Sequence, residues 1–130
     1  MRRIVSAIAA LLISITTANA QTSGIGPGTQ TCNEFGRAYQ QTQQLQQRGN
    51  VRGPNMIEEY YFSWAQGFFT GLNIVPIMTK YGKPRDLKSI PVDQQQQFLR
   101  DYCDKNPQAS YMSGVVVLYN KFELRADPRS

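Results

Sequence analysis

The sequence predicts an all-α fold, a single small domain of about four main helices stapled by one disulfide, and three observations support this. Four segments carry apolar residues at helical spacing rather than at the two-residue spacing of strands. Ser, Thr, Asn or Pro residues stand where such helices would begin, and Gly or Pro residues stand between them. The chain of 130 residues holds two cysteines, placed far apart. No internal repeat or second domain is evident.

The segment 1–20 has the composition of a secretory signal peptide, with a basic start, an apolar run and an Ala-Asn-Ala cleavage site. We therefore expect a periplasmic protein that, after cleavage, has no apolar run long enough to span a membrane. The remaining chain divides into a flexible N-terminus at 21–30, a helical domain at 31–124 and a frayed C-terminus at 125–130.

Composition excludes several functions. The formal net charge of +5 falls to +3 without the two arginines of the leader, too little to indicate a nucleic-acid partner. The chain has no histidine, which excludes Ser-His-Asp and Cys-His catalysis. Two distant cysteines without histidine also make a poor set of zinc ligands. Two pairs of carboxylates could in principle act as a catalytic acid and base. The pair at 58–59 is better explained by the first turn of a helix, where the helix dipole favours negative charge, and Asp101 and Asp104 by a polar helix face. We expect no enzymatic activity, metal or cofactor.

Export would place Cys32 and Cys103 where disulfides form and persist. A bond between them closes a loop of some 70 residues and removes roughly 4 kcal/mol of unfolded-state freedom in the chain-entropy model. The alternatives are two free thiols or a bridge between chains.

The first helix is expected over 32–47. Thr31 followed by Glu34 matches a capping box, in which each side chain binds the other residue's backbone N–H. The apolar stripe persists through a glutamine-rich stretch, which favours a solvated helix face over an aggregation-prone tract.

The second helix is expected over 56–75, capped by Asn55, and forms the apolar centre of the protein. Gly67 and Gly71 each cost about 1 kcal/mol of helix propensity, which predicts that another backbone approaches closely there. Their polar neighbours favour a contact in a soluble core over a membrane helix pair. Pro76 is expected to end or kink the helix.

A third helix is expected to start at 89–91 and to end near the second cysteine. Asn106 followed by Pro107 predicts the cap and first residue of a fourth helix that runs to about Leu124. Within it, the valines at 115–117 favour a strand by propensity, but the spacing of the apolar residues favours a helix.

The aromatic residues of the second helix, Tyr60, Tyr61, Trp64 and Phe68, span more than one helix face. Most aromatic side chains are expected in the core of so small a domain. Some aromatic surface is therefore left exposed or meets a partner, and an oligomer interface is the alternative to core packing.

Three blocks of sequence resemble the Rap1a/Tai family of small periplasmic proteins: a first cysteine at 32, the pattern W-x-x-G-[FY]-x-x-G-x-N at 64–73, and Y-C-x-x-N-P at 102–107. This resemblance implies a helical, disulfide-bonded, often dimeric immunity protein of type VI secretion that binds and blocks a peptidoglycan amidase. The motif residues with an expected structural role are Trp64, Gly67, Phe68, Gly71, Asn73, Tyr102, Asn106 and Pro107.

The stretches 31–35 and 108–111 are also similar to the HdeA family of acid-stress chaperones. That similarity implies a holdase that exposes apolar surface when acid protonates its carboxylates. The composition departs from the HdeA pattern, because glutamine stands where those proteins are dense in lysine and acidic residues.

The family does not supply contact residues, so the expected partner surface rests on charge. The loops 48–55 and 82–90 carry basic side chains that would steer an acidic protein partner. These residues are Arg48, Arg52, Lys83, Arg85 and Lys88.

Overall fold

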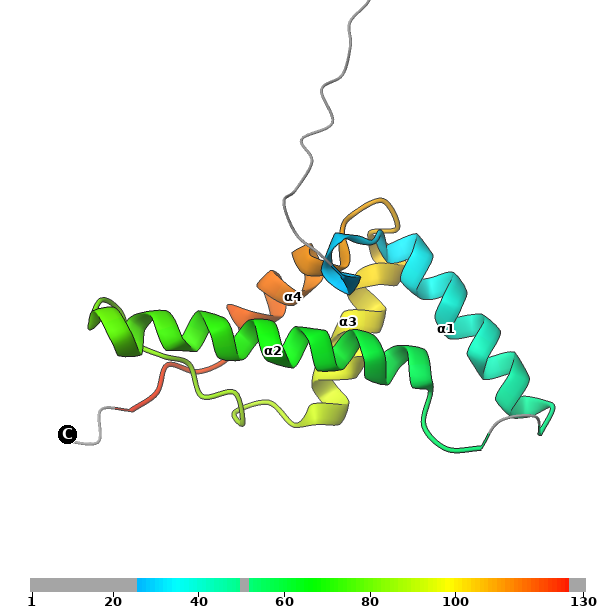
Figure 1. Ribbon diagram of the computed structural model, residues 1–130, viewed down its shortest axis with the longest axis horizontal. Helices are drawn as coiled ribbons and strands as arrows, with labels where there is room; N and C mark the ends of the chain where they lie inside the picture. Colours follow the sequence, from blue (N-terminus) through cyan, green and yellow to red (C-terminus); the bar gives the residue numbers. More distant parts are fainter. Residues whose placement is uncertain (1–25, 50–51, 127–130) are drawn as a thin grey trace, which may run out of the picture.

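The computed structural model describes residues 26–49 and 52–126 (Figure 1). They form one short 3-10 turn and four α-helices: η1 Pro27–Thr29, α1 Cys32–Gln47, α2 Met56–Thr79, α3 Val92–Lys105 and α4 Tyr111–Tyr119. The predicted all-α class, the four helices and the disulfide are confirmed. The predicted leader at 1–20 and the last residues of the predicted frayed end lie outside the described residues.

In the view of Figure 1 the long helix α2 passes in front of α3, and it packs against α1 and α4. Helix α3 packs against both α1 and α4, and η1 packs against α2 and α4. The core lies between these elements and is mostly aromatic and aliphatic. Its buried hydrophobic members are Cys32, Phe35, Tyr61, Phe62, Ala65, Phe69, Leu99, Cys103, Tyr111, Val115, Leu118 and Phe122. Burial raises the pKa of the Tyr111 phenol above its ordinary value, because the core disfavours the charged form.

Helix α1 begins as predicted. The Thr31 hydroxyl accepts a hydrogen bond from the Glu34 N–H at 3.2 Å, and a Glu34 carboxylate oxygen accepts one from the Thr31 N–H at 2.7 Å. Cys32, the first residue of α1, is bonded to Cys103 near the end of α3. The disulfide therefore fixes one end of α1 against one end of α3.

The expected flexible segment is ordered in its last five residues. Pro27 and Gly28 are buried, and η1 packs on α2. The Gln30 carbonyl accepts from the Tyr111 N–H at 2.8 Å, and the Gln30 side chain accepts from the Tyr61 hydroxyl. The prediction failed here because glycine and proline are typical of tight turns as well as of flexible segments. Their presence alone does not distinguish the two.

Helix α2 does not end at Pro76 but continues to Thr79, where Lys80 takes a left-handed conformation with φ of 58°. A proline inside a helix removes one backbone hydrogen bond and crowds the carbonyl four residues earlier. The side chains around Pro76, among them Val75 and Ile77, are exposed, and water can satisfy the lost bond there. The predicted end at 75 is therefore wrong.

The fourth helix is shorter than predicted at both ends. Asn106 caps the end of α3 instead of the start of α4, since its amide donates to the Tyr102 carbonyl at 2.8 Å. The carbonyls of Pro107 and Ala109 accept from the first N–H groups of α1 at 2.9 and 2.8 Å. The segment after α3 therefore serves as a cap for α1, and Ser110 caps α4.

The end of α4 is set by a neighbouring segment. The Arg85 guanidinium donates to the carbonyls of Asn120 and Phe122 at 3.2 and 2.7 Å, and Arg85 pairs with Leu124 in an isolated bridge. The chain therefore turns at 120–122 and then pairs beside residue 85, instead of continuing the helix to Leu124. The residues at 115–117 lie within α4, so the helical interpretation of the valines is confirmed.

Candidate functional site

The motif tryptophan lies beneath the N-terminal turn. Trp64 stacks on Phe68 with ring centroids 5.4 Å apart and planes 19° apart. A Cβ atom added to Gly28 would lie 2.1 Å from the indole ring, so only glycine permits this contact. Sequence reasoning missed Gly28, because nothing in the N-terminal segment indicates which residue it covers.

The motif asparagine joins three parts of the chain. The Asn73 amide donates to the Arg85 carbonyl at 2.8 Å and accepts from the Arg85 N–H at 2.9 Å. Its oxygen also accepts from the Tyr119 hydroxyl at 2.8 Å. Asn73 therefore ties α2 to the segment after it and to α4, which is a structural role.

The close approach of helices expected at Gly67 and Gly71 occurs elsewhere. A Cβ atom added to either glycine would meet nothing within 4 Å, and both residues are exposed. The close approach lies between α3 and α4, where a Cβ on Gly114 would be 2.6 Å from the Tyr102 ring. The prediction of a core contact at Gly67 and Gly71 is therefore wrong.

The five basic residues expected on the partner surface do not form one patch. Arg48 and Arg52 lie near the start of α2, whereas Lys83 follows its end, and a helix of 24 residues is about 36 Å long. The Arg85 guanidinium is bound to backbone carbonyls and lies 5.4 Å from the Tyr119 ring centroid. Lys88 is exposed near the start of α3.

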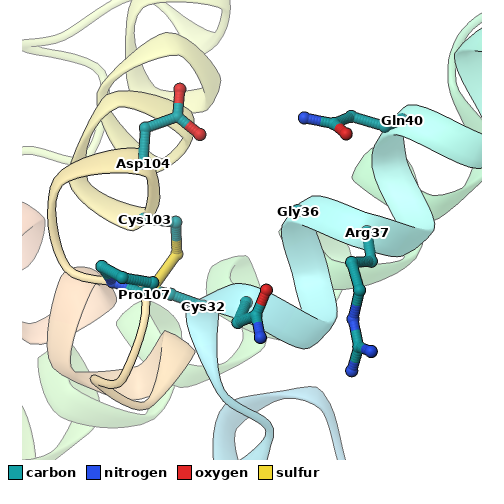
Figure 2. A pocket seen from close by; sticks show the side chains of 8 residues that line it. Cys32, Gly36, Arg37, Gln40, Cys103, Asp104 and Pro107 are labelled. Carbon is teal, nitrogen blue, oxygen red and sulfur yellow. A yellow bond between two sulfur atoms is a disulfide. The ribbon is translucent and has the colours of Figure 1, made fainter.

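A groove beside the disulfide lies between α1 and α3 (Figure 2). Two adjoining hollows of about 170 and 120 Å³ share Gly36, Gln40 and Asp104, and we call them together the α1/α3 groove. Figure 2 shows Gln40 and Asp104 on opposite sides of the opening, with the disulfide below them. The remaining lining residues are Cys32, Asn33, Phe35, Arg37, Tyr39, Gln43, Arg100, Cys103 and Pro107.

Glycine keeps the floor of this groove open. A Cβ atom on Gly36 would meet nothing within 4 Å, although glycine within a helix costs about 1 kcal/mol relative to alanine. A glycine inside the amphipathic 32–47 pattern was a signal that sequence reasoning did not use. The site therefore contains one half-buried helix position whose backbone no side chain of its own covers.

The side chains that line the groove differ in how firmly they are held. Arg100 forms an ion pair with Glu58 and lies 5.9 Å from the Tyr39 ring centroid, so this one side chain of α3 is fixed. Four lining side chains make no hydrogen bond to another described residue, and their polar groups can bind a partner. They are Asn33, Arg37, Gln40 and Asp104.

Among residues 26–49 and 52–126, no three or more Cys, Asp and Glu side chains gather where they would hold a metal ion. In the same ranges no helix has the length and hydropathy to cross a membrane. Comparison with protein families, with curated proteins and with solved structures finds no match to this chain. The fold and the groove define a small disulfide-bonded helical domain with a shallow, mostly polar groove beside the disulfide.

Proposed function

We propose that this protein is an exported periplasmic binding protein of the immunity type, which binds and blocks a cell-wall amidase without catalysing a reaction itself. The observation that carries the proposal is the α1/α3 groove, whose floor is open at Gly36. The three sequence blocks that resemble the Rap1a/Tai family support the same class of function. The signal-peptide pattern supports the compartment.

The dimensions of the groove favour a protein partner over a small ligand. Ligand pockets usually hold about 300–1,000 Å³, and the two hollows, of about 170 and 120 Å³, reach at most the lower end of this range together. A loop or a few side chains of a folded partner fit a shallow opening of this kind. Arg37 and Asp104 offer charges of both signs, and Asn33 and Gln40 offer amides, so the surface recognises polar groups instead of apolar ones.

The disulfide gives this surface a fixed shape. Cys32 and Cys103 lie in the wall of the groove and join the two helices that form it. A surface that does not rearrange on binding loses less conformational entropy, which favours tight association. The exposed basic residues Arg48, Arg52, Lys83 and Lys88 lie outside the groove and would act at longer range, by steering an acidic partner.

Capture from periplasmic and secreted fractions tests the class of function. The oxidised protein should retain one cell-wall amidase at pH 7, and the purified amidase should lose activity when the protein is added in equal amount. Capture of many unrelated proteins only after a brief exposure to acid would contradict this and would indicate the alternative, an acid-activated holdase.

A pair of matched substitutions tests the site. Gly36→Arg places a long side chain on the groove floor at a position where its Cβ meets nothing within 4 Å, and we expect it to weaken amidase binding at least tenfold, since it obstructs the centre of the interface. Gly67→Arg introduces the same side chain at another open helix position and should leave amidase binding per chain unchanged. Equal effects of the two substitutions would place the binding site elsewhere.

A further inference from the structure

We propose that the C-terminal end of α2 binds the surface of a membrane that contains anionic lipids. This end comprises residues 74–83 together with Leu124 and Arg125, and we call it the α2 tip. None of these residues lines the α1/α3 groove, so the proposal is independent of the proposed amidase partner.

The α2 tip projects beyond α3 and α4 (Figure 1). The buried residues of α2 all precede Asn73, whose side chain is bonded to Arg85 and Tyr119. Six residues of α2 follow Asn73. At a rise of 1.5 Å per residue they extend about 9 Å further. The last turns of α2 therefore lie outside the core.

Apolar side chains are exposed over a wide part of the helix circumference at the α2 tip. At about 100° per residue, Ile77, Ile74, Met78 and Val75 follow one another around about 160° of α2. All four are exposed, and Met78 is 77 % exposed. Tyr81, just past the end of the helix, is 83 % exposed. Contiguous exposed apolar surface of this kind marks a contact with a protein or a membrane.

Basic side chains flank this apolar surface. Lys80 and Lys83 are exposed and follow α2 directly. The Arg125 N–H donates to the Pro84 carbonyl at 2.9 Å, which brings a third exposed basic residue to the same end of the molecule. The stretch 60–85 contains no carboxylate. The α2 tip is therefore positively charged and complements an anionic surface.

Two carboxylates of the described residues, Asp86 and Glu123, adjoin the α2 tip in sequence but lie on its α3 side. Arg85 pairs antiparallel with Leu124, and the Asp86 N–H donates to the Glu123 carbonyl at 2.8 Å. In this pairing Asp86 and Glu123 lie toward α3, whereas Arg125 lies toward α2. The basic residues are therefore nearer than the carboxylates to the exposed apolar side chains.

This combination favours a lipid surface over a second copy of the chain. In an anionic membrane the phosphate groups lie directly above the acyl chains, and in the α2 tip the basic groups lie beside apolar side chains. Two α2 tips in contact would bring Lys80 and Lys83 of both copies together, and these like charges oppose association.

The α2 tip suits the headgroup region of a membrane. Tyrosine is enriched at this level, where its ring contacts acyl chains and its hydroxyl contacts water. The Thr79 hydroxyl donates to the Val75 carbonyl at 2.8 Å, so it needs no other acceptor. Interfacial helices enter a membrane by about 5–10 Å. The exposed end of α2 has a length that matches this depth.

Flotation with lipid vesicles tests the proposal on the oxidised protein, purified from cells that express the full chain. We expect binding to vesicles of phosphatidylcholine mixed with phosphatidylglycerol, and much weaker binding to vesicles of phosphatidylcholine alone. Added salt should weaken the first interaction, because it screens the attraction of the basic residues to the lipid phosphates.

Two methionines of α2 provide a matched pair of substitutions. Met78→Asp places a carboxylate in the α2 tip and should weaken vesicle binding at least tenfold, since it removes an apolar side chain and repels the lipid phosphates. Met56→Asp makes the same change at the start of α2, where the methionine is 65 % exposed, and should leave vesicle binding unchanged.

Charge substitutions separate the α2 tip from the net charge of the chain. A basic residue near an anionic surface strengthens binding about fivefold, so Lys80→Gln with Lys83→Gln should weaken vesicle binding at least tenfold. Arg48→Gln with Arg52→Gln removes the same charge near the start of α2, and we expect little effect.

A tryptophan at the α2 tip reports the insertion directly. The emission of Tyr81→Trp should shift to shorter wavelength when phosphatidylglycerol vesicles are added, because the indole leaves water. Tyr60→Trp is the control, since this exposed tyrosine lies near the other end of α2 and its emission should stay unchanged. Trp64 contributes equally to both variants.

Each of four outcomes would overturn the proposal. The protein binds the two kinds of vesicle equally or binds neither; or the lysine and arginine pairs have equal effects; or the Tyr81→Trp emission does not shift. In the fourth, Met78→Asp leaves vesicle binding intact but dissociates a dimer or abolishes amidase binding, which would assign the α2 tip to a protein contact.

Discussion

Glycine has opposite effects at different positions of this chain, according to what surrounds the missing Cβ atom. At Gly28 the space is filled by the rigid Trp64 ring, and at Gly114 by the Tyr102 ring. At Gly36, Gly67 and Gly71 the space is empty. The first group is needed for packing within the chain, and the second group costs helix stability without allowing any close contact among the described residues.

Alanine substitutions separate these two groups. Gly28→Ala should destabilise the protein by about 1–3 kcal/mol, since its methyl group would overlap an indole ring that cannot bend away. Gly36→Ala should stabilise it by about 0.5–1 kcal/mol, because alanine is the better helix former. Urea unfolding of the oxidised proteins measures both. A loss of stability in both variants would contradict the open space at Gly36.

A substitution of Asn73 tests how much a single side chain contributes to the stability of the fold. Asn73→Ala removes the two bonds to the Arg85 backbone and the bond from Tyr119, and leaves partly buried groups unpaired. We expect a loss of about 1–3 kcal/mol in the free energy of unfolding. Asn120→Ala, which removes only a 3.4 Å contact to the Arg85 side chain, should cost less. An equal loss would show that the Asn73 contacts contribute little.

The individual helices differ in how far their ends follow from local sequence. The start of α1 was predictable, because Thr31 and Glu34 cap the helix through contacts three residues apart. The ends of α4 were not, because Asn106 is used by α3 and the chain after 119 is held by Arg85. The α1/α3 groove was missed for the same reason, since its walls come from helices that are distant in sequence.

The cap of α1 makes stability depend on pH. Hydrogen bonds from the Thr31 N–H and then from its hydroxyl hold the pKa of Glu34 below its ordinary value of 4.5. The ionised carboxylate therefore stabilises the folded state above pH 4.5, and this contribution disappears as the pH falls through the lowered folded value. We expect Glu34→Gln to be less stable than the original chain at pH 7, and the difference to shrink below pH 4.5.

Urea unfolding across this pH range measures the Glu34 effect. Glutamine still fits a capping box, so the substitution removes the charge and keeps the helix start. A stability difference that stays constant from pH 7 to acid would mean that the Glu34 charge does not act through the cap.

At the scale of the whole molecule, one covalent bond and one short turn fix the arrangement of α1 and α3. The disulfide spans 71 positions, and the carbonyls after α3 bind the first N–H groups of α1 beside it. Replacing both cysteines by serine should cost about 2–5 kcal/mol and should widen the α1/α3 groove. Thermal unfolding and amide hydrogen exchange in α1 would measure the two effects.

The same bond has a consequence for a chain that a protease has cut. The disulfide closes a ring that includes α1, α2 and most of α3, so that a single cleavage between Cys32 and Cys103 opens the ring but releases no fragment. The nicked protein keeps its full mass until it meets a reductant. In a compartment that contains proteases but no reductant, one such break therefore does not divide the molecule.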